Sequence, residues 1–345
     1  MRILTVKGAG EFTAGPKAPS DIIEILEKRY NAKSELLIQG TNAIQKINYR
    51  LKIFSTILKC RMKKEVLVMQ FPMYETTNFL NKLFLCALNL INKEKTIVLI
   101  HDLDSIRGED EVLKKQELDR LSKIKYIIVH NQKMKQYLEN IGIKANLYCL
   151  ELFDYICDKK SDFERKDTLI DKNNLQLVYA GNLVEVKSPF IYQLEEDKMK
   201  FKINLYGIGV DKDINGKLIY KGKYNPNELP DKIEGDLGLI WDGNFDESDE
   251  NIRYKNYTKY NNPHKLSCYM AAGLPVIVWR KTAISEFVKK YDLGYTITNL
   301  YDINNLDLSD YDKKIENVKK IQEKARNGEF TVNVLEQVLK DMGEQ

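Results

Sequence analysis

The sequence has few of the residues that mark specialised classes of protein. Its 345 residues include 18 glycines, 8 prolines, 5 cysteines and 2 tryptophans. The low glycine and proline content excludes collagen-like and low-complexity chains. The cysteines are odd in number and lack the spacing of metal ligands, so we interpret them as reduced thiols of a cytosolic protein. They are Cys60, Cys86, Cys149, Cys157 and Cys268.

The charge balance and the apolar runs exclude further classes. A formal net charge of +4 is too near neutral for the concentrated basic face of a nucleic-acid-binding protein. The longest apolar stretches, Leu83–Leu88 and Met270–Trp279, fall well short of the ~20 residues that a membrane span needs. Lys7 interrupts the short apolar start where a secretion signal needs a continuous run. The sequence therefore predicts a cytoplasmic protein with no nucleic-acid partner.

Short apolar runs alternate with helical patterns, which favours an α/β fold with parallel sheets. The length suggests two domains, and the polar stretch over 153–172 reads as a linker between them. We expect one domain over 1–155 and another over 172–329, with a helix over 330–345 that is free to pack back on the first. Strands are predicted at Ile3–Val6, Glu35–Ile38, Val66–Met69, Thr96–Ile100, Tyr126–Val129, Leu175–Tyr179, Lys202–Tyr206, Leu218–Tyr220, Gly238–Trp241, Pro275–Val278 and Tyr295–Ile297. Further helices are predicted from Ser20, as an N-cap, and over Tyr311–Gly343.

The segment from Tyr260 to Gly273 carries the clearest site pattern. Asn262 is predicted to cap a helix, Pro263 suits its first turn, and Gly273 is placed to end it. The N-terminus of a helix favours anions, and Lys265 stands in the first turn, so the pattern indicates a diphosphate site. The alternative is an ordinary capped helix with a solvated lysine.

Two other segments follow predicted strands, where ligands bind in open parallel sheets. Gly181 allows a ligand to approach the backbone closely, and Lys187 stands near the next helix; a structural turn is the alternative. In the segment from His101 to Arg107, Asp102 and Asp104 suit a general base, an ion pair with Arg107, or metal ligands together with His101. We favour no metal site there. His130 is interpreted as a structural histidine.

Eight segments, in this order, resemble the bacterial β-1,6-galactofuranosyltransferases of O-antigen and polysaccharide synthesis, a group of GT-B-fold glycosyltransferases. They are Phe71–Met73, LIHDLDSIRG (99–108), VHNQKMKQYL (129–138), FDY (153–155), VYAGNL (178–183), GLIWDG (238–243), YNNPHKLSCYMAAGLPVIVW (260–279) and RNGEF (326–330). The long segment that begins at Tyr260 is the most specific. The glucosyltransferases that extend glycans on bacterial serine-rich adhesins are similar too, so the resemblance defines the reaction more narrowly than the sugar.

The resemblance implies two Rossmann-like domains that face each other across an interdomain cleft, with the nucleotide-sugar mainly in the second and the acceptor mainly in the first. It assigns donor binding to Gly181, Asn182, Lys187, Asn262, Pro263, His264, Lys265 and Ser267, the acceptor side to Gly15, Lys17, His101 and Arg107, and the catalytic base to Asp104 or Asp102. The paired glutamates of retaining GT-B families would fall on Tyr260 and Cys268, which are not carboxylates. We therefore expect inversion, without metal or cofactor.

The function implied is transfer of a hexosyl group, galactofuranosyl from UDP-galactofuranose, to a lipid- or protein-linked glycan in bacterial surface polysaccharide synthesis. Three alternatives stay open: a UDP-glucose-dependent glucosyltransferase acting on glycoprotein glycans, a non-hydrolysing nucleotide-sugar epimerase, and a catalytically silent sugar-binding subunit. A basic cluster of Lys59, Arg61, Lys63 and Lys64 adds the expectation of peripheral contact, by charge alone, with the inner face of the cell membrane. A homo-oligomer is compatible with the sequence.

Overall fold

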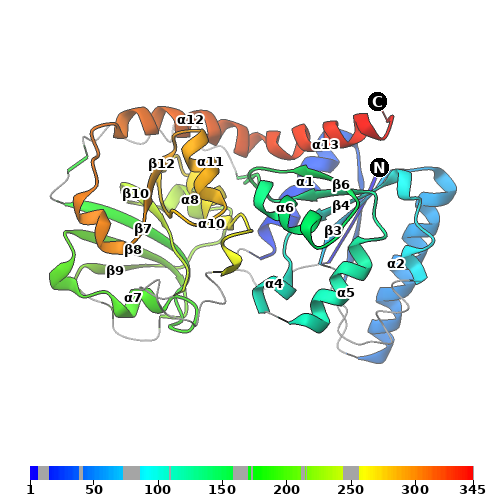
Figure 1. The fold of residues 1–345 in the computed structure, drawn as a ribbon, viewed down its shortest axis with the longest axis horizontal. Coiled ribbons are helices and arrows are strands. Elements are labelled where there is room, and N and C mark those ends of the chain that lie inside the picture. Colours follow the sequence, from blue (N-terminus) through cyan, green and yellow to red (C-terminus); the bar gives the residue numbers. More distant parts are fainter. Residues whose placement is uncertain are drawn as a thin grey trace. The chain divides into compact units, whose positions relative to one another are not determined.

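The computed structural model describes residues 1–6, 15–38, 42–72, 86–108, 110–157, 170–171, 174–210, 214, 216–243 and 256–344. Within them the chain forms two compact units (Figure 1). The first comprises the opening strand, Gly15–Glu151 and the chain from Phe330 onward, and the second comprises Leu152–Glu329. The change of unit falls at Leu152 because Leu152, Phe153 and Tyr155 are buried in the second unit. Most of the expected polar linker lies outside the described residues.

The first unit is built on a six-stranded parallel sheet with the order β2-β1-β3-β4-β5-β6. Its strands are β1 (Arg2–Val6), β2 (Lys33–Leu37), β3 (Leu67–Phe71), β4 (Thr96–Ile100), β5 (Tyr126–Val129) and β6 (Asn146–Cys149). Strands β3, β4 and β5 are buried along their whole length, as in parallel sheets with both faces covered. The predicted bounds of β4 and β5 are confirmed. Strand β6 was missed, because this short, partly exposed edge strand lacks a continuous apolar run.

The helical elements of the first unit are α1 (Lys17–Tyr30), α2 (Ala43–Lys63), η1 (Lys93–Lys95), α4 (Asp104–Gly108), α5 (Glu111–Leu121), α6 (Gln132–Asn140) and α13 (Glu329–Asp341). The prediction of Ser20 as an N-cap is wrong. Helix α1 already begins at Lys17, because Pro19 is tolerated in its first turn. The Ser20 hydroxyl therefore lies inside the helix, where it donates to the Pro16 carbonyl at 2.8 Å. None of the helices in the described part of the chain is long and apolar enough to cross a membrane.

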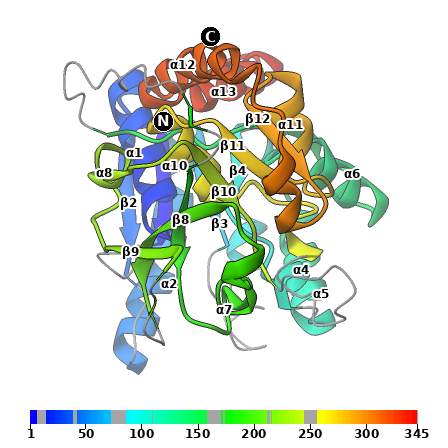
Figure 2. The same ribbon diagram turned by 90° about the vertical axis from the view of Figure 1, so that its left-hand side faces the viewer.

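The second unit is built on another six-stranded parallel sheet, with the order β12-β11-β10-β7-β8-β9. Its strands are β7 (Leu175–Asn182), β8 (Phe201–Ile208), β9 (Leu218–Gly222), β10 (Leu237–Ile240), β11 (Val276–Trp279) and β12 (Gly294–Ile297). Its helical elements are α7 (Pro189–Gln193), η2 (Glu196–Lys198), α8 (Leu229–Lys232), α10 (His264–Ala271), α11 (Ile284–Lys290), η3 (Leu300–Asn305) and α12 (Tyr311–Asn327). Each strand predicted for this half of the sequence overlaps an observed one, and α10 lies against β10 (Figure 2).

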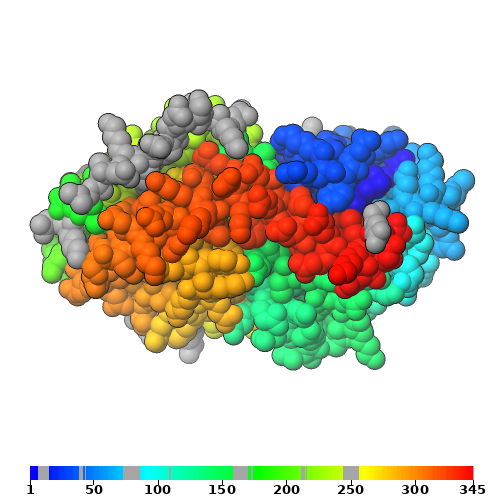
Figure 3. Space-filling model, turned by 90° about the horizontal axis from the view of Figure 1, so that it is seen from above, coloured from blue at the N-terminus to red at the C-terminus, as the bar shows by residue number. Residues whose placement is uncertain are grey.

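The predicted helix over Tyr311–Gly343 is two helices, α12 and α13. They separate at Gly328, which has a left-handed backbone with φ 77° and closes α12 as its C-cap. Both are amphipathic surface helices, and Figure 3 shows them on the exterior of the molecule. Helix α12 belongs to the second unit, while α13 packs on the first, where the Tyr148 hydroxyl donates to the Asp341 carboxylate at 2.6 Å.

Both sheets have Rossmann-like topology, and each has one point where the strand order reverses. In the first sheet the reversal lies between β1 and β3, and in the second it lies between β7 and β10. At such a switch point the connections leave on opposite faces, which opens a crevice beyond the carboxyl ends of the strands. The β7–β10 switch point is therefore the first place to look for a ligand site in the second unit.

Candidate functional site

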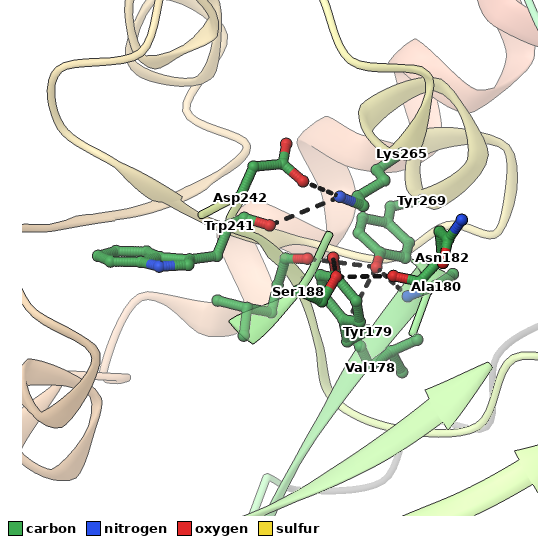
Figure 4. A network of polar contacts seen from close by, with 10 residues as sticks. Val178, Tyr179, Ala180, Asn182, Ser188, Trp241, Asp242, Lys265 and Tyr269 are labelled. Atoms are coloured by element: carbon green, nitrogen blue, oxygen red, sulfur yellow. Dashed lines mark hydrogen bonds and ion pairs between the residues drawn. The ribbon is translucent and has the colours of Figure 1, made fainter. Parts of the chain in front are cut away.

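Tyr269, a buried residue of α10, bridges β7 and β10 at the switch point, where the two strands stop pairing. The two strands pair only through Leu177–Leu237 and Val178–Gly238. Beyond these pairs the Tyr269 hydroxyl, from α10, accepts the Ala180 N–H at 2.8 Å and lies within donating distance of two strand carbonyls (Figure 4). The ring covers Gly238, where a Cβ would come within 2.5 Å of ring carbon. The hydroxyl thus replaces strand pairing and fixes α10 to both strands.

The Lys265 ammonium lies at this switch point. Lys265 is in the first turn of α10, and its Nζ contacts Asp242 Oδ1 at 2.5 Å, just after β10. The same Nζ lies 4.7 Å from the centre of the Tyr179 ring, on β7. Burial opposes the charge on Lys265, but Asp242 and Tyr179 outweigh it and raise the pKa of the ammonium. The group therefore stays protonated through the physiological range.

The turn after β7 is tied to this cation through a chain of hydrogen bonds. The Tyr179 and Ser188 hydroxyls are 2.6 Å apart, and Ser188 donates to the Asn182 carbonyl at 2.7 Å. The Asn182 side chain accepts the Val184 N–H at 3.0 Å. A Cβ at Gly181 would lie 3.0 Å from Cε of Lys265, so this strand end approaches the lysine closely. Together these bonds position the strand end as well as the lysine (Figure 4).

The start of α10 corrects one prediction and confirms another. Asn262 is not the N-cap: Pro263 occupies that position, and its own side chain has no group that could cap the helix. The backbone of Pro263 is extended, with ψ 137°, because the helix begins only at His264. Gly273 follows the end of the helix with φ 70°, as predicted. The first N–H groups of α10 point out of its N-terminus, where the helix dipole favours an anion.

The remaining donor candidates are placed differently from one another. Asn262 and Ser267 are buried, whereas Lys187 is exposed in the turn before Ser188. His264 packs against two aromatic rings, with its ring centre 5.3 Å from that of Tyr155 and 6.0 Å from that of Phe153. The structure therefore brings Gly181, Asn182 and Lys265 together at the switch point and places His264 on an aromatic surface of the same unit.

In the first unit, Asp102 and Asp104 have different surroundings. The Arg107 guanidinium donates to Asp102 Oδ1 at 2.7 Å, so the ion pair considered from the sequence is present. Asp104 is the first residue of α4; burial, and then the charge of Asp102, raise the pKa of its carboxyl. Of the two, Asp104 is the better proton acceptor. Among the described residues, no three histidine, cysteine or acidic side chains gather as a metal site.

The other acceptor-side candidates are held by local contacts. The His101 ring bonds to the Gln70 side chain, and its backbone N–H donates to the Phe71 carbonyl at 2.7 Å. Lys17 is buried in an ion pair with Asp21, one turn along α1. Gly15 is exposed, with open space around its α-carbon. The contacts of His101 link the carboxyl ends of β3 and β4, whereas the Lys17–Asp21 pair lies within α1.

Sequence reasoning missed Glu117, a buried carboxylate on α5. It is 3% exposed and accepts the Asp104 N–H at 3.0 Å, the Ser105 N–H and the Ser105 hydroxyl. Burial raises its pKa to about 7, although the hydrogen bonds from Ser105 oppose this. Glu117 thereby caps α4 and orients Asp104. Its lysine-rich surroundings in the sequence are typical of a solvent-exposed helix face, which hid the role.

His130 has the structural role predicted for it. It is 1% exposed and its Nε2 lies 3.1 Å from the Ile100 carbonyl. Burial lowers its pKa to about 4, so the ring is neutral at physiological pH. A neutral ring that bonds to the neighbouring strand stabilises the sheet.

Comparison with known proteins gives concordant results. Residues 1–152 match the model of the N-terminal domain of glucosyltransferase 3-like proteins, and residues 177–338 match that of their C-terminal domain. The β-1,6-galactofuranosyltransferase WbbI of Escherichia coli K12 is 31% identical over 343 residues, which are 95% of each chain. Glucosyltransferase 3 of Streptococcus gordonii is 23% identical over 281 residues, or 79% of this chain and 78% of that one.

Solved structures agree on the fold. Alr3699/HepE of Anabaena, solved in complex with UDP, superposes with a TM-score of 0.61 at 12% identity, over 99% of this chain and 100% of that one. Sucrose-phosphate synthase of Thermosynechococcus elongatus also superposes with a TM-score of 0.61 at 12% identity, over 99% and 97% of the two chains. With two Rossmann-like units in the chain, these likenesses confirm the predicted GT-B fold.

Proposed function

We propose that this chain, which belongs to the glucosyltransferase 3-like family of glycosyltransferases, transfers a galactofuranosyl group from UDP-galactofuranose to a glycan acceptor in bacterial surface polysaccharide synthesis. That the chain is a glycosyltransferase follows from its relatives, and the choice of sugar rests on WbbI, at 31% identity over 95% of both chains. UDP as the nucleotide is supported by the UDP in the HepE complex.

The observation that carries the proposal is the Lys265 ammonium at the β7–β10 switch point. A donor diphosphate placed there would meet the N-terminus of α10 and this cation, while Gly181 lets the backbone of β7 approach it. Asn182 and Lys187 would contact the donor from the turn after β7, and Asn262, Pro263, His264 and Ser267 from the start of α10. Lys265, held by Asp242, is ordered before the donor arrives, which is the condition for electrostatic catalysis.

The reaction proposed is a single displacement with inversion. Asp104 takes the proton of the acceptor hydroxyl, whose oxygen then forms a bond to the anomeric carbon as the bond to the UDP oxygen breaks. The raised pKa of Asp104 supports it as the base, whereas Asp102 is committed to Arg107. Gly15, Lys17 and His101 are proposed for the acceptor side. The negative charge that grows on the leaving diphosphate is stabilised by Lys265 and the α10 N–H groups, so we propose that neither a metal ion nor a cofactor takes part.

A second candidate is transfer of glucose from UDP-glucose to a glycoprotein glycan, favoured by the matches to glucosyltransferase 3-like domains and to the S. gordonii enzyme. The test is turnover of the full chain with each donor on simple glycoside acceptors, with product analysis by NMR. The proposal requires a β-galactofuranosyl product and faster turnover with UDP-galactofuranose. Faster glucosyl transfer would establish the second candidate instead.

The other two alternatives are tested by this assay with acceptor, for the silent subunit, and by the same assay without acceptor, for the epimerase. An epimerase would convert the UDP-sugar by itself, and its NMR spectrum would change without a glycoside present. A silent sugar-binding subunit would bind UDP and give no product with either donor. Either result would contradict the transferase reaction proposed for this chain.

A further inference from the structure

Helix α2 has an exposed apolar face. Six side chains, at spacings of three and four residues, point away from the protein: Ile44 (72% exposed), Ile47 (56%), Leu51 (60%), Phe54 (44%), Leu58 (41%) and Met62 (75%). The opposite face packs into the core through Tyr49, Ile53, Ile57 and Cys60. At about 100° per residue, the six exposed side chains fall within an arc of about 80° on the helix. We call them the apolar stripe. Soluble proteins rarely leave such a continuous stripe exposed without a binding role.

Basic side chains border the apolar stripe on both sides. The sequence of α2 contains six lysines and arginines and no acidic residue, although the whole chain carries a net charge of only +4. Arg50 and Arg61 lie along one edge of the stripe, and Lys52, Lys59 and Lys63 along the other. Their chains are long enough to place the charges beside an apolar surface into which the stripe is inserted. This arrangement is typical of helices that lie in the interface of an anionic membrane.

We propose that α2 binds anionic phospholipid membranes, with its axis parallel to the surface and the apolar stripe inserted at the level of the headgroups. Membrane contact by the basic cluster alone, as expected from the sequence, would not use the stripe. A second copy of the chain fits the face less well, because α2 has six basic residues and no acidic one, so two such helices would bring like charges together. Lys52 has a partner in its own unit, since its Nζ lies 3.8 Å from Glu35 Oε2 on β2. The proposal is independent of the sugar transferred, since binding is measured without donor or acceptor.

The two parts of the surface have separable effects. A basic residue near an anionic surface contributes about fivefold to binding, so three substitutions should weaken it about 100-fold. Removal of three inserted apolar side chains should weaken it about 100-fold or more. Electrostatic attraction is screened by salt, whereas apolar insertion is not. High salt should therefore weaken wild-type binding without abolishing it.

The experiment is co-flotation of the full chain with vesicles of phosphatidylglycerol and phosphatidylcholine, and with vesicles of phosphatidylcholine alone. Three variants are compared with the wild type. The apolar variant carries Ile47→Ser, Leu51→Ser and Phe54→Ser, and the basic variant carries Lys52→Gln, Lys59→Gln and Lys63→Gln. The matched control carries Lys289→Gln, Lys319→Gln and Lys320→Gln, which remove the same charge from exposed sites of the second unit.

The wild type and the control should bind the anionic vesicles, while the apolar and basic variants should be lost from the floated fraction. Phe54→Trp should also show a blue-shifted emission when anionic vesicles are added. The proposal is overturned if the wild type ignores anionic vesicles, or if the control loses as much binding as the basic variant. It is also overturned if light scattering shows an oligomer that the apolar variant dissociates, because another copy would then cover the stripe.

Discussion

The ion pair between Lys265 and Asp242 allows stability and activity to be separated. Lys265→Met keeps the aliphatic stem over Tyr179 but removes the ammonium that lies 2.5 Å from Asp242. The two side chains are 16% and 24% exposed, so the pair is only partly desolvated, and breaking it should cost less than a fully buried pair. We expect a loss of about 2 kcal/mol. For a domain of this size, that corresponds to a fall in Tm of about 4–8 °C.

The activity should fall much further than the stability implies. If Lys265 stabilises the leaving diphosphate, its removal should lower kcat by about 10²–10³, the typical effect of losing one preorganised donor. The control is Asp242→Asn, which breaks the same ion pair but keeps the ammonium. It should lower Tm by a similar amount while kcat stays within about tenfold of the wild type. Equal losses of kcat in both variants, or near-normal turnover of Lys265→Met, would refute the assignment of Lys265 to the donor.

Four further results are expected. Turnover should persist in excess chelator, because Lys265 and the α10 N–H groups supply the positive charge; complete loss that Mg²⁺ restores would contradict this. Tyr269→Phe should destabilise the protein by about 1–3 kcal/mol in chemical unfolding, because the buried Ala180 N–H loses its partner. Gly207→Ala should prevent folding or lower Tm sharply, since a Cβ there would lie 1.7 Å from the Gly181 carbonyl oxygen. The raised pKa of Glu117, about 7, means that the wild type should lose stability relative to Glu117→Gln as pH rises from about 4.5 to about 7, measured as the difference in Tm.

The buried strands of both sheets were predictable because buried parallel strands are short, continuous apolar runs, whereas the partly exposed edge strand β6 was missed. Thr96–Ile100 and Tyr126–Val129 even have the predicted bounds. Helix starts were less predictable where proline occupies the N-cap. Pro16 has this position in α1 and Pro263 in α10, and in both cases a nearby side chain was mistaken for the cap. The single residue that separates α12 from α13, Gly328, was equally hard to recognise inside one long helical pattern.

The candidate site was predictable only where its residues follow a strand or begin a helix. Lys265 was recognised from its place in a helix start, and Gly181 from its place after a strand. The residues that order the surrounding backbone were missed, because their contacts join positions that are far apart in the sequence and leave no local pattern. Tyr269 reaches the carbonyl of Val178, 91 residues away, and Glu117 bonds to Ser105 from the middle of a lysine-rich helix. Contacts of this kind depend on the strand order, which the sequence does not specify locally.

Hydrogen exchange followed by mass spectrometry, with and without UDP, tests most directly whether the nucleotide binds at the β7–β10 switch point. We expect UDP to slow exchange in peptides that contain the end of β7 with the turn to Ser188, the residues after β10, and the first turn of α10. Lys265→Met should weaken this protection at the same UDP concentration. Protection confined to the first unit, or to the amino ends of β7 and β8, would contradict the account, as would unchanged exchange at saturating UDP.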